Sequence, residues 1–421
     1  MRDLLVTAII LGSLPYIMKR PWIGVLMWSW IGYMNPHRLT WGFAFDMPFA
    51  QIVALVLFVS ILLDKEKKEF PPSGGMLWVW ASFIAWMALT STFALYVGDA
   101  WTQYIKIIKI QIVTFLTILL ITDQKKIDLL IWVIVASIGF YSIKGGIFTV
   151  MTGGVSRVYG PPGGFIQENN SLALATLMVI PLMIYLYRIT ETRWLKLGIG
   201  GAVLLSLVSA LGSQSRGALL AIIAVSGYFW ISSRYKFVTG IAIVVLAVIG
   251  FMFMPESWHA RMDTIQNYEQ DASAMGRINA WWYAFNVANE RLTGAGLNSW
   301  NLGSFYKYAP NPLDVHAAHS IYFGVLADHG WPGLFMFLTV IAMAWHNLSW
   351  VIKHAVATPM AHLASSIKVS LIAYMSGGAF LSLAYFDLPW HLYAISILLR
   401  YQTRDLKPEP HRPLRMMRHA R

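Results

Sequence analysis

The 421-residue sequence contains no cysteine and few charged residues. Without cysteine, the chain can form no disulfide and has no thiolate nucleophile or cysteine ligand for a metal. Charged residues make up only 12% of the chain, whereas 57% of the residues are hydrophobic. A soluble core cannot bury so much apolar surface, and the apolar residues recur in runs of membrane-spanning length. The composition therefore predicts a polytopic, all-α membrane protein, because only helices satisfy the backbone across such runs.

The sequence also lacks the common motifs of nucleotide and hydrolase chemistry. It has no GxxxxGK[ST] loop, no GxGxxG turn after a strand, no GxSxG elbow and no HExxH helix. An enzyme of this kind needs a donor that is already activated, and we expect neither a metal nor another cofactor. The first apolar run has no basic segment before it and no small-residue cleavage site, which predicts a retained span.

The apolar runs predict about 12 spans, since the shortest of them fall below the ~20 residues that a straight crossing needs. The runs lie near residues 3–18, 21–34, 46–63, 75–97, 104–122, 127–150, 170–187, 194–212, 217–233, 236–254, 332–352, 367–386 and 388–400.

The net charge of +12 comes from Lys and Arg in short loops and in the C-terminal tail. This distribution is typical of cytoplasmic loops and does not indicate a nucleic-acid partner. We therefore divide the chain into about ten transmembrane helices (1–254), a long polar loop (255–331), the C-terminal transmembrane helices (332–400) and a basic cytoplasmic tail (401–421). The same assignment places four polar segments together on the opposite face: 151–169, 212–216, 255–331 and the bend near Asp387.

Four arginines lie on that opposite face, although positively charged residues usually gather in cytoplasmic loops. Arg157, Arg216, Arg261 and Arg277 are candidates for binding an anion, because guanidinium groups fit phosphate oxygens. Anchoring of a span at the lipid headgroups is the alternative for each of them. Arg216 begins a span, where the helix N-terminus adds to its positive field.

Three lysines lie inside apolar runs. Lys106, Lys109 and Lys144 each fall within about two turns of the outer end of a span. There a lysine either extends to the headgroups or faces a ligand cavity. Lys106 and Lys109 are therefore candidates for binding substrate.

The end of the polar loop carries the candidate base. His316 and His319 would share one face of a helix. No ligand spacing accompanies them, so metal binding is not expected. His319 enters an apolar segment that favours a neutral imidazole, a suitable general base for a hydroxyl. His316 and Tyr322 are candidates for binding substrate. The acids of the loop, including Glu290, Asp314 and Asp328, are expected to be solvated or paired with arginines.

In order and spacing, these residues make the chain resemble the O-antigen ligase and polymerase superfamily. The resemblance covers most of the chain and adds Asn170 to the candidates for substrate binding, while Ser320 stands where many members have asparagine. It rests on Asn35-Pro36-His37-Arg38-Leu39, Arg157, Gly160, Asn170-Ser171-Leu172-Ala173, Ser215-Arg216-Gly217, Arg277 with Trp281, His319-Ser320, Gly330 and Gly333.

The resemblance implies a metal-independent membrane glycosyltransferase with a GT-C-like fold. Such ligases transfer a glycan from undecaprenyl diphosphate to lipid A–core oligosaccharide at the periplasmic face of the bacterial inner membrane. Carried over by motif, Arg216 and Arg277 would hold the diphosphate, and His319 would deprotonate the acceptor hydroxyl. Arg157 and Arg261 would assist.

Two other functions stay open. An enzyme of the same fold could act as a polymerase or as a protein O-oligosaccharyltransferase. A transporter of lipid-linked glycans is the third possibility, but it predicts internal repeats and charges near the bilayer midplane, which the sequence does not show.

Overall fold

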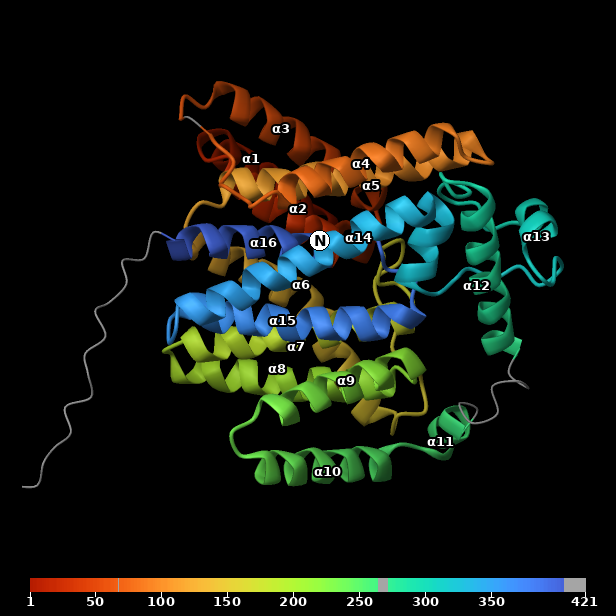
Figure 1. Cartoon of the computed structure of the whole chain (residues 1–421). Coiled ribbons are helices and arrows are strands. Elements are labelled where there is room, and N and C mark those ends of the chain that lie inside the picture. Colours follow the sequence, from red (N-terminus) through yellow and green to blue (C-terminus); the bar gives the residue numbers. More distant parts are fainter. Residues whose placement is uncertain (67, 264–271, 405–421) are drawn as a thin grey trace, which may run out of the picture.

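The protein is a bundle of helices. The computed structural model describes residues 1–66, 68–263 and 272–404, and every regular element in these ranges is a helix (Figure 1). The predicted all-α fold is therefore confirmed. In chain order the helices are α1 (Arg2–Lys19), α2 (Trp22–Met34), η1 (Pro36–Leu39), η2 (Phe43–Asp46), α3 (Phe49–Leu63), α4 (Met76–Thr92), α5 (Val97–Leu120), α6 (Gln124–Met151), α7 (Asn169–Ile189), α8 (Arg193–Gly212), α9 (Arg216–Ser232), α10 (Lys236–Phe253), α11 (Glu256–Asp263), α12 (Ala272–Glu290), α13 (Leu302–Tyr308), α14 (Ile321–His354), α15 (Pro359–Gly377), η4 (Gly378–Phe380) and α16 (Asp387–Arg404).

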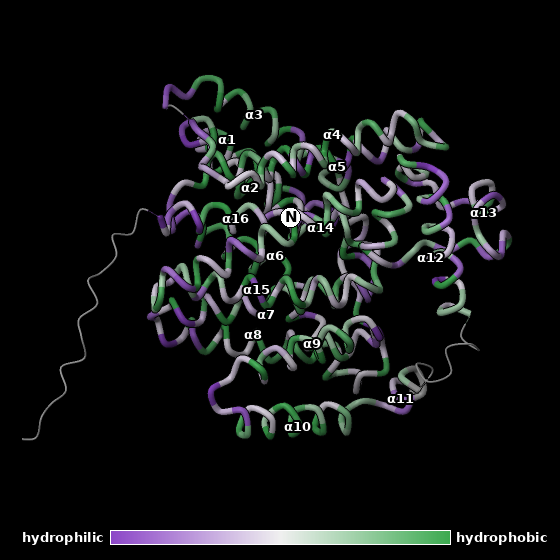
Figure 2. The backbone as a smooth tube through the Cα atoms, in the orientation of Figure 1, coloured by the Kyte–Doolittle hydropathy of each residue, from purple (hydrophilic) through white to green (hydrophobic). Residues whose placement is uncertain are grey.

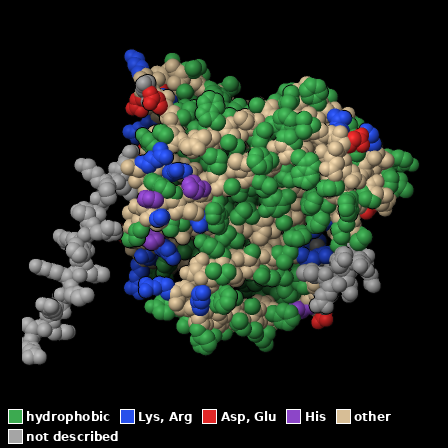
Figure 3. All heavy atoms as spheres, in the orientation of Figure 1, with side chains coloured by type: hydrophobic (Ala, Val, Ile, Leu, Met, Phe, Trp, Pro, Cys, Tyr) green, Lys and Arg blue, Asp and Glu red, His purple; other side chains and the backbone are tan. Residues whose placement is uncertain are grey.

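Seven of the described helices are long and apolar enough to cross a membrane: α5, α6, α7, α8, α10, α14 and α15. The shorter helices α3, α4 and α9 are also apolar. Apolar residues run along the bundle helices (Figure 2), and apolar side chains cover much of the visible surface (Figure 3). An outer surface of this kind requires lipid around it. The chain is thus a multi-pass membrane protein, while the number of about 12 spans remains a prediction.

Helix α7 lies at the centre of the bundle. It packs against α6, α8, α9 and α15, and most of its side chains are buried. Helices α6 and α8 approach each other closely, because a Cβ atom at Gly146 would collide with the backbone of Leu205. Small residues at such contacts are typical of helix packing in membranes.

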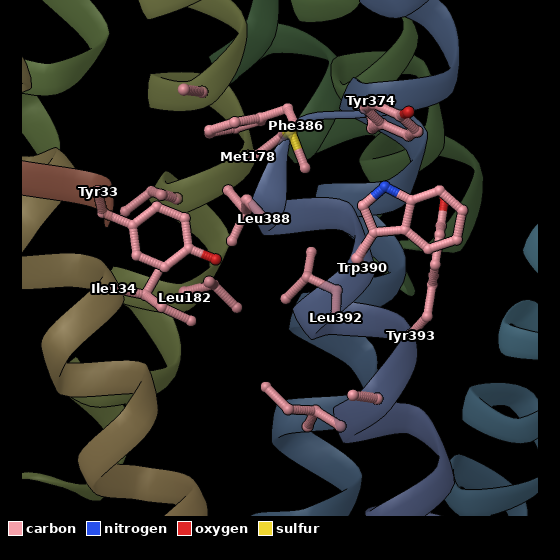
Figure 4. Close-up of a cluster of buried hydrophobic side chains, with 14 of the residues drawn as sticks. Tyr33, Ile134, Met178, Leu182, Tyr374, Phe386, Leu388, Trp390, Leu392 and Tyr393 are labelled. Carbon is pink, nitrogen blue, oxygen red and sulfur yellow. The ribbon is translucent and has the colours of Figure 1, made fainter. Parts of the chain in front are cut away.

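Aromatic side chains pack α16 into the bundle. The ring of Trp390 lies 5.2 Å from that of Trp80 and stacks on Phe83 at 6.1 Å, measured between centroids. Figure 4 shows Trp390 close to Tyr393 on the same helix. This cluster joins α16 to α4 through aromatic contacts.

One predicted span has the wrong bounds, since the span-length helix α15 begins at Pro359 and ends before residue 386. The apolar run at 367–386 predicts a continuous helix, but α15 ends at Gly377 and the chain runs without helix from Leu381 to the start of α16. Leu381, Leu383 and Phe386 are nevertheless buried. The apolar character predicts burial correctly but not the helix, because here protein rather than lipid covers the backbone.

Helix α14 is broken at Gly330. This residue has φ 65° and ψ −173°, a conformation that is open mainly to glycine. Pro332 follows and has no N–H to donate to the preceding turn. Residues 321–329 therefore form a short helix of their own, and the span predicted at 332–352 begins just after the break.

Donors from other segments satisfy the carbonyl groups that the break leaves without helical partners. Such carbonyls would otherwise be costly at membrane depth. The three bonds run from Ala295 N to Ala327 O (2.7 Å), from Gly296 N to Asp328 O (3.1 Å) and from Trp86 Nε1 to His329 O (2.9 Å).

Substitution of Gly330 tests the break. Gly330→Ala should lower the free energy of unfolding by more than about 2 kcal/mol, since alanine disfavours this conformation and its Cβ would collide with Leu292 O. Gly324→Ala on the same helix is the matched control, because a Cβ there meets no atom within 4 Å. It should be neutral or stabilise by up to about 1 kcal/mol. Thermal unfolding in detergent measures both, and equal effects would contradict a constrained break.

Candidate functional site

The four predicted polar segments meet at one end of the bundle, as expected. We call this the loop end; it is formed by residues 151–168, 213–215, 272–320 and 378–386. Asn169 Nδ2 at the start of α7 donates to Ser213 O at 2.8 Å. Gln214 Nε2 donates to Gly154 O (3.1 Å) and to Val155 O (3.0 Å). These bonds join the loop before α7 to the turn before α9.

Arg216 is the first residue of α9 and is half-buried at the loop end. Ser215 caps the helix by accepting a bond from Ala218 N at 3.2 Å. A Cβ atom at Gly217 would lie 3.5 Å from Phe380 Cβ and 3.6 Å from Gly377 O, so the start of α9 packs directly on the end of α15. The guanidinium and the helix N-terminus therefore add their positive fields at the same place.

Helix α12 holds the chain that leads to His319. Asn279 Nδ2 donates to Asn311 O (2.8 Å) and Asp314 O (2.9 Å), and Asn286 Nδ2 donates to Tyr308 O (2.8 Å). Side chains of one rigid helix thus replace the backbone partners that an irregular segment lacks. This arrangement positions residues 308–318 against α12.

His319 lies between two anchored neighbours. Trp281 Nε1 donates to Ala318 O at 2.8 Å, and its ring stacks on Phe323 at 5.0 Å between centroids. Ser320 caps the helix that follows by accepting bonds from Tyr322 N (3.3 Å) and Phe323 N (3.4 Å). His319 itself has a φ of 42°, a left-handed conformation that is uncommon outside glycine and is found at functional sites.

Charged groups surround the half-buried His319 ring. Burial lowers the pKa of His319, and the positive charge of Arg277 lowers it further, whereas Glu168 acts in the opposite direction and His316 adds a small lowering effect. Arg277 and Glu168 therefore both lie near the imidazole and change its pKa in opposite directions. Burial and the charge of Arg277 both favour the neutral form of the imidazole, the form that can accept a proton.

His316 packs on α12 beside Arg277. A Cβ atom at Gly276 would lie only 2.5 Å from His316 Nδ1, so the glycine leaves room for the ring. The same nitrogen lies 2.7 Å from Asp314 Oδ1. Among the residues that the structure describes, no three His, Asp or Glu side chains could hold a metal ion together.

The other candidates lie at the loop end or on the helix that follows His319. Arg157 is exposed, with Nε 3.5 Å from Gln214 Oε1, and so belongs to the loop end. Asn170 is half-buried there, beside the buried Asn169. Tyr322 donates its hydroxyl to Met375 O at 2.8 Å and thereby joins the helix after His319 to α15.

The two lysine candidates are not part of this group. Lys106 and Lys109 are exposed on α5, whose main neighbours are α2, α4 and α16. Their use in binding substrate stays a prediction. The side chain of Arg261 lies outside the described residues.

The expectation for the loop acids is partly wrong. Glu290 pairs with Lys307 at 2.8 Å and Asp314 pairs with His316, so neither depends on an arginine. Asp328 is neither solvated nor paired with an arginine: it is 5% exposed, and its Oδ2 lies 2.9 Å from the hydroxyl oxygen of Tyr385. The reason is tertiary, because the break in α14 turns Asp328 inward toward a segment far along the chain.

Sequence reasoning missed Glu168 and Asn169 as site residues. Glu168 directly precedes α7 and Asn169 begins it, in a segment that the charge pattern already assigns to the loop end. An acidic residue among the arginines of the loop end is the signal that could have identified Glu168, because its negative charge offsets theirs. The missing information was that this acid lies close enough to raise the pKa of His319, which is 151 positions away in the chain (319 − 168).

Comparison with protein families divides the chain in two. Residues 201–338 match the family described as O-antigen ligase, and residues 1–191 match a family of unknown function (DUF5935). No curated protein matches the chain. The first match ends between α7 and α8 and the second begins within α8, so Glu168 lies in one region while Arg216, Arg277 and His319 lie in the other.

Titration of His319 tests the charge arrangement. Nuclear magnetic resonance of labelled histidine should give a pKa below the ordinary value of about 6.5. Arg277→Gln should raise the pKa of His319 and Glu168→Gln should lower it, because the two charges act with opposite sign. Shifts in the same direction would show that at least one of the two side chains does not act through its charge. His346→Asn, on the exposed face of α14, identifies an unrelated signal and serves as the control.

Proposed function

We propose that the protein is a membrane glycosyltransferase, because residues 201–338 match the O-antigen ligase family. It transfers a glycan from undecaprenyl diphosphate to a hydroxyl of lipid A–core oligosaccharide. The observation that carries this proposal is the half-buried His319 at a helix start, with Arg277 nearby and α9 beginning at Arg216. The candidate base and the candidate diphosphate-binding arginines therefore lie at the same end of the bundle.

Arg216 and Arg277 would bind the donor diphosphate. Guanidinium groups bind phosphate oxygens through two parallel bonds, and the N-terminus of α9 adds backbone donors. In the transition state negative charge builds up on the leaving diphosphate, so these groups stabilise it most when the glycosidic bond is breaking. A single substitution should therefore reduce turnover more than binding.

His319 would accept the proton of the acceptor. As the acceptor oxygen attacks the anomeric carbon, its proton passes to the free nitrogen of His319, and the diphosphate leaves with the electron pair of the broken bond. One displacement of this kind inverts the anomeric configuration. A trapped glycosyl-enzyme intermediate would contradict it, since that species requires two displacements.

The loop end would face the periplasm. The described Lys and Arg residues gather mainly at the opposite end of the bundle (Figure 3), which is the distribution of cytoplasmic loops. The inner membrane of a bacterium provides both this orientation and a lipid-linked donor. The polyprenyl tail would remain in the bilayer while its diphosphate reaches Arg216 through a lateral opening.

A transfer assay tests the proposal. Purified protein in detergent receives a defined undecaprenyl-diphosphate glycan, purified lipid A–core and a chelator. Wild type should form product, and His319→Ala and Arg216→Ala should each lower the rate by about 100-fold or more, as expected for a lost base or a lost stabilising cation. Gel mobility and mass spectrometry of the acceptor measure the product.

Matched controls separate these roles from general damage. His346→Asn and Arg188→Ala remove an exposed histidine and an exposed arginine away from the loop end and should keep the wild-type rate. A His319→Ala protein that is as active as wild type would rule out His319 as the base. Elongation of the lipid-linked glycan, or labelling of a polypeptide, would instead assign the protein as a polymerase or a protein O-oligosaccharyltransferase. Absence of any transfer would favour a transporter.

A further inference from the structure

A buried polar cluster lies behind the break in α14. We call it the Asp328 cluster; its members are Thr90 of α4, Asp328 and His329 of α14, and Tyr385 of the segment before α16. Thr90 and His329 are fully buried, Asp328 is 5% exposed and Tyr385 is half-buried. None of them belongs to the transfer site described above, so their role requires a separate explanation.

Four short contacts form one continuous chain through the cluster. Because each contact joins two oxygen or nitrogen atoms, each needs one proton to become a hydrogen bond. The contacts are Asp328 Oδ2 to Tyr385 Oη (2.9 Å), Tyr385 Oη to His329 Nε2 (2.9 Å), His329 Nδ1 to Thr90 Oγ1 (2.7 Å) and Thr90 Oγ1 to Met87 O (3.0 Å).

The protons available do not match the number of contacts. With Asp328 ionised and His329 neutral, the cluster offers one proton each from Tyr385, His329 and Thr90. Three protons cannot complete four bonds, so one buried contact would bring two lone pairs together. A fourth proton completes every bond and also removes the net negative charge of the cluster.

Asp328 is the better place for that proton. If the fourth proton were on His329, the histidine cation and the Asp328 carboxylate would both be buried in a poorly solvated interior. Only the Tyr385 hydroxyl would lie between these two charges. Asp328 Oδ1 is also buried, and among the described residues no donor is within hydrogen-bonding distance of it. An ionised carboxylate with one unpaired oxygen is costly, whereas a carboxylic acid can leave its carbonyl oxygen unpaired at lower cost.

We propose that Asp328 retains its proton at neutral pH, and that the protonated cluster positions the short helix 321–329 and, through it, His319. The direction of every bond then follows. Asp328 donates to Tyr385, Tyr385 donates to His329 Nε2, His329 Nδ1–H donates to Thr90, and Thr90 donates to Met87 O. The chain joins α14, α4 and the 381–386 segment at the point where α14 lacks its own helical bonds.

The ionisable groups around the cluster do not favour an ionised Asp328. Tyr283 of α12 uses its hydroxyl on Ser299 Oγ (3.0 Å), and Tyr374 of α15 donates to Leu383 O (3.3 Å). The Arg291 guanidinium donates to the backbone oxygens of Gly294 (2.9 Å) and Phe93 (2.6 Å). Within the described ranges no cationic side chain forms a hydrogen bond or ion pair with Asp328 that would favour its ionised form.

Infrared spectroscopy and thermal unfolding test the protonation directly. The spectrum of wild type minus Asp328→Asn should contain the carbonyl stretch of a protonated carboxylic acid at pH 7. In the unfolded chain Asp328 ionises near pH 4, so folding takes up a proton above that pH. The Tm of wild type should therefore fall relative to that of Asp328→Asn as the pH rises from about 5 to about 9. Glu290→Gln, which removes an exposed carboxylate, should show neither effect.

Activity then tests the positioning role, which rests on the proposed function. Asp328→Asn keeps a neutral donor and should stay within about threefold of the wild-type kcat, whereas Asp328→Ala and Tyr385→Phe interrupt the chain and should lower kcat by about tenfold or more. At high pH the kcat of wild type should decline while that of Asp328→Asn persists.

Each outcome is decisive. Absence of the carboxylic acid band, or a Tm difference that does not change with pH, would overturn the protonated cluster. Equal activity of Asp328→Asn and Asp328→Ala would overturn the positioning role. Because the infrared and unfolding measurements need no substrate, they decide the first claim even if the protein transfers no glycan.

Discussion

The requirement that every buried backbone group find a partner governs this structure. Helices satisfy this requirement along the spans, but at the break in α14 near Gly330 the helix cannot supply the hydrogen-bond partners itself. There two other segments supply the partners: α4 through Trp86, and the loop after α12 through Ala295 and Gly296. The side chains of the Asp328 cluster also link α14 to α4 and to the segment before α16. The break is thus also a junction that holds the loop end together.

The same principle explains how an irregular segment can carry a well-positioned histidine. Residues 308–318 lack regular structure, yet Asn279, Asn286 and Trp281 of α12 bind their backbone carbonyls. His319 is therefore held by a helix on one side and begins a helix on the other. The left-handed φ of His319 is maintained by these neighbours, since the residue alone would not favour it.

The electrostatic balance at His319 depends on parts of the chain that belong to different family regions. Arg277 comes from the O-antigen ligase region, Glu168 comes from the region that matches the family of unknown function, and Phe380, which contacts Trp281, lies beyond both. The surroundings of His319 are therefore assembled from all three parts, and the N-terminal region contributes Glu168 to them.

The sequence alone determined the features that depend on local composition and order. Apolar runs predicted the helices, charge bias predicted that four loops meet at one end, and Ser215 and Ser320 mark helix starts beside Arg216 and His319. These are short-range properties, since a helix and its cap involve residues within a few positions of each other.

Only the tertiary structure decided which side chains face one another. It placed Glu168 near His319, buried Asp328 against Tyr385 and left Lys106 on an exposed face of α5. It also shifted the span predicted at 367–386 toward the N-terminus, since α15 begins at Pro359 and a largely buried segment without helix follows from Leu381. The physical reason is that a helix-length apolar run predicts burial but does not determine whether lipid or protein covers it, and contacts between distant residues depend on how the helices pack.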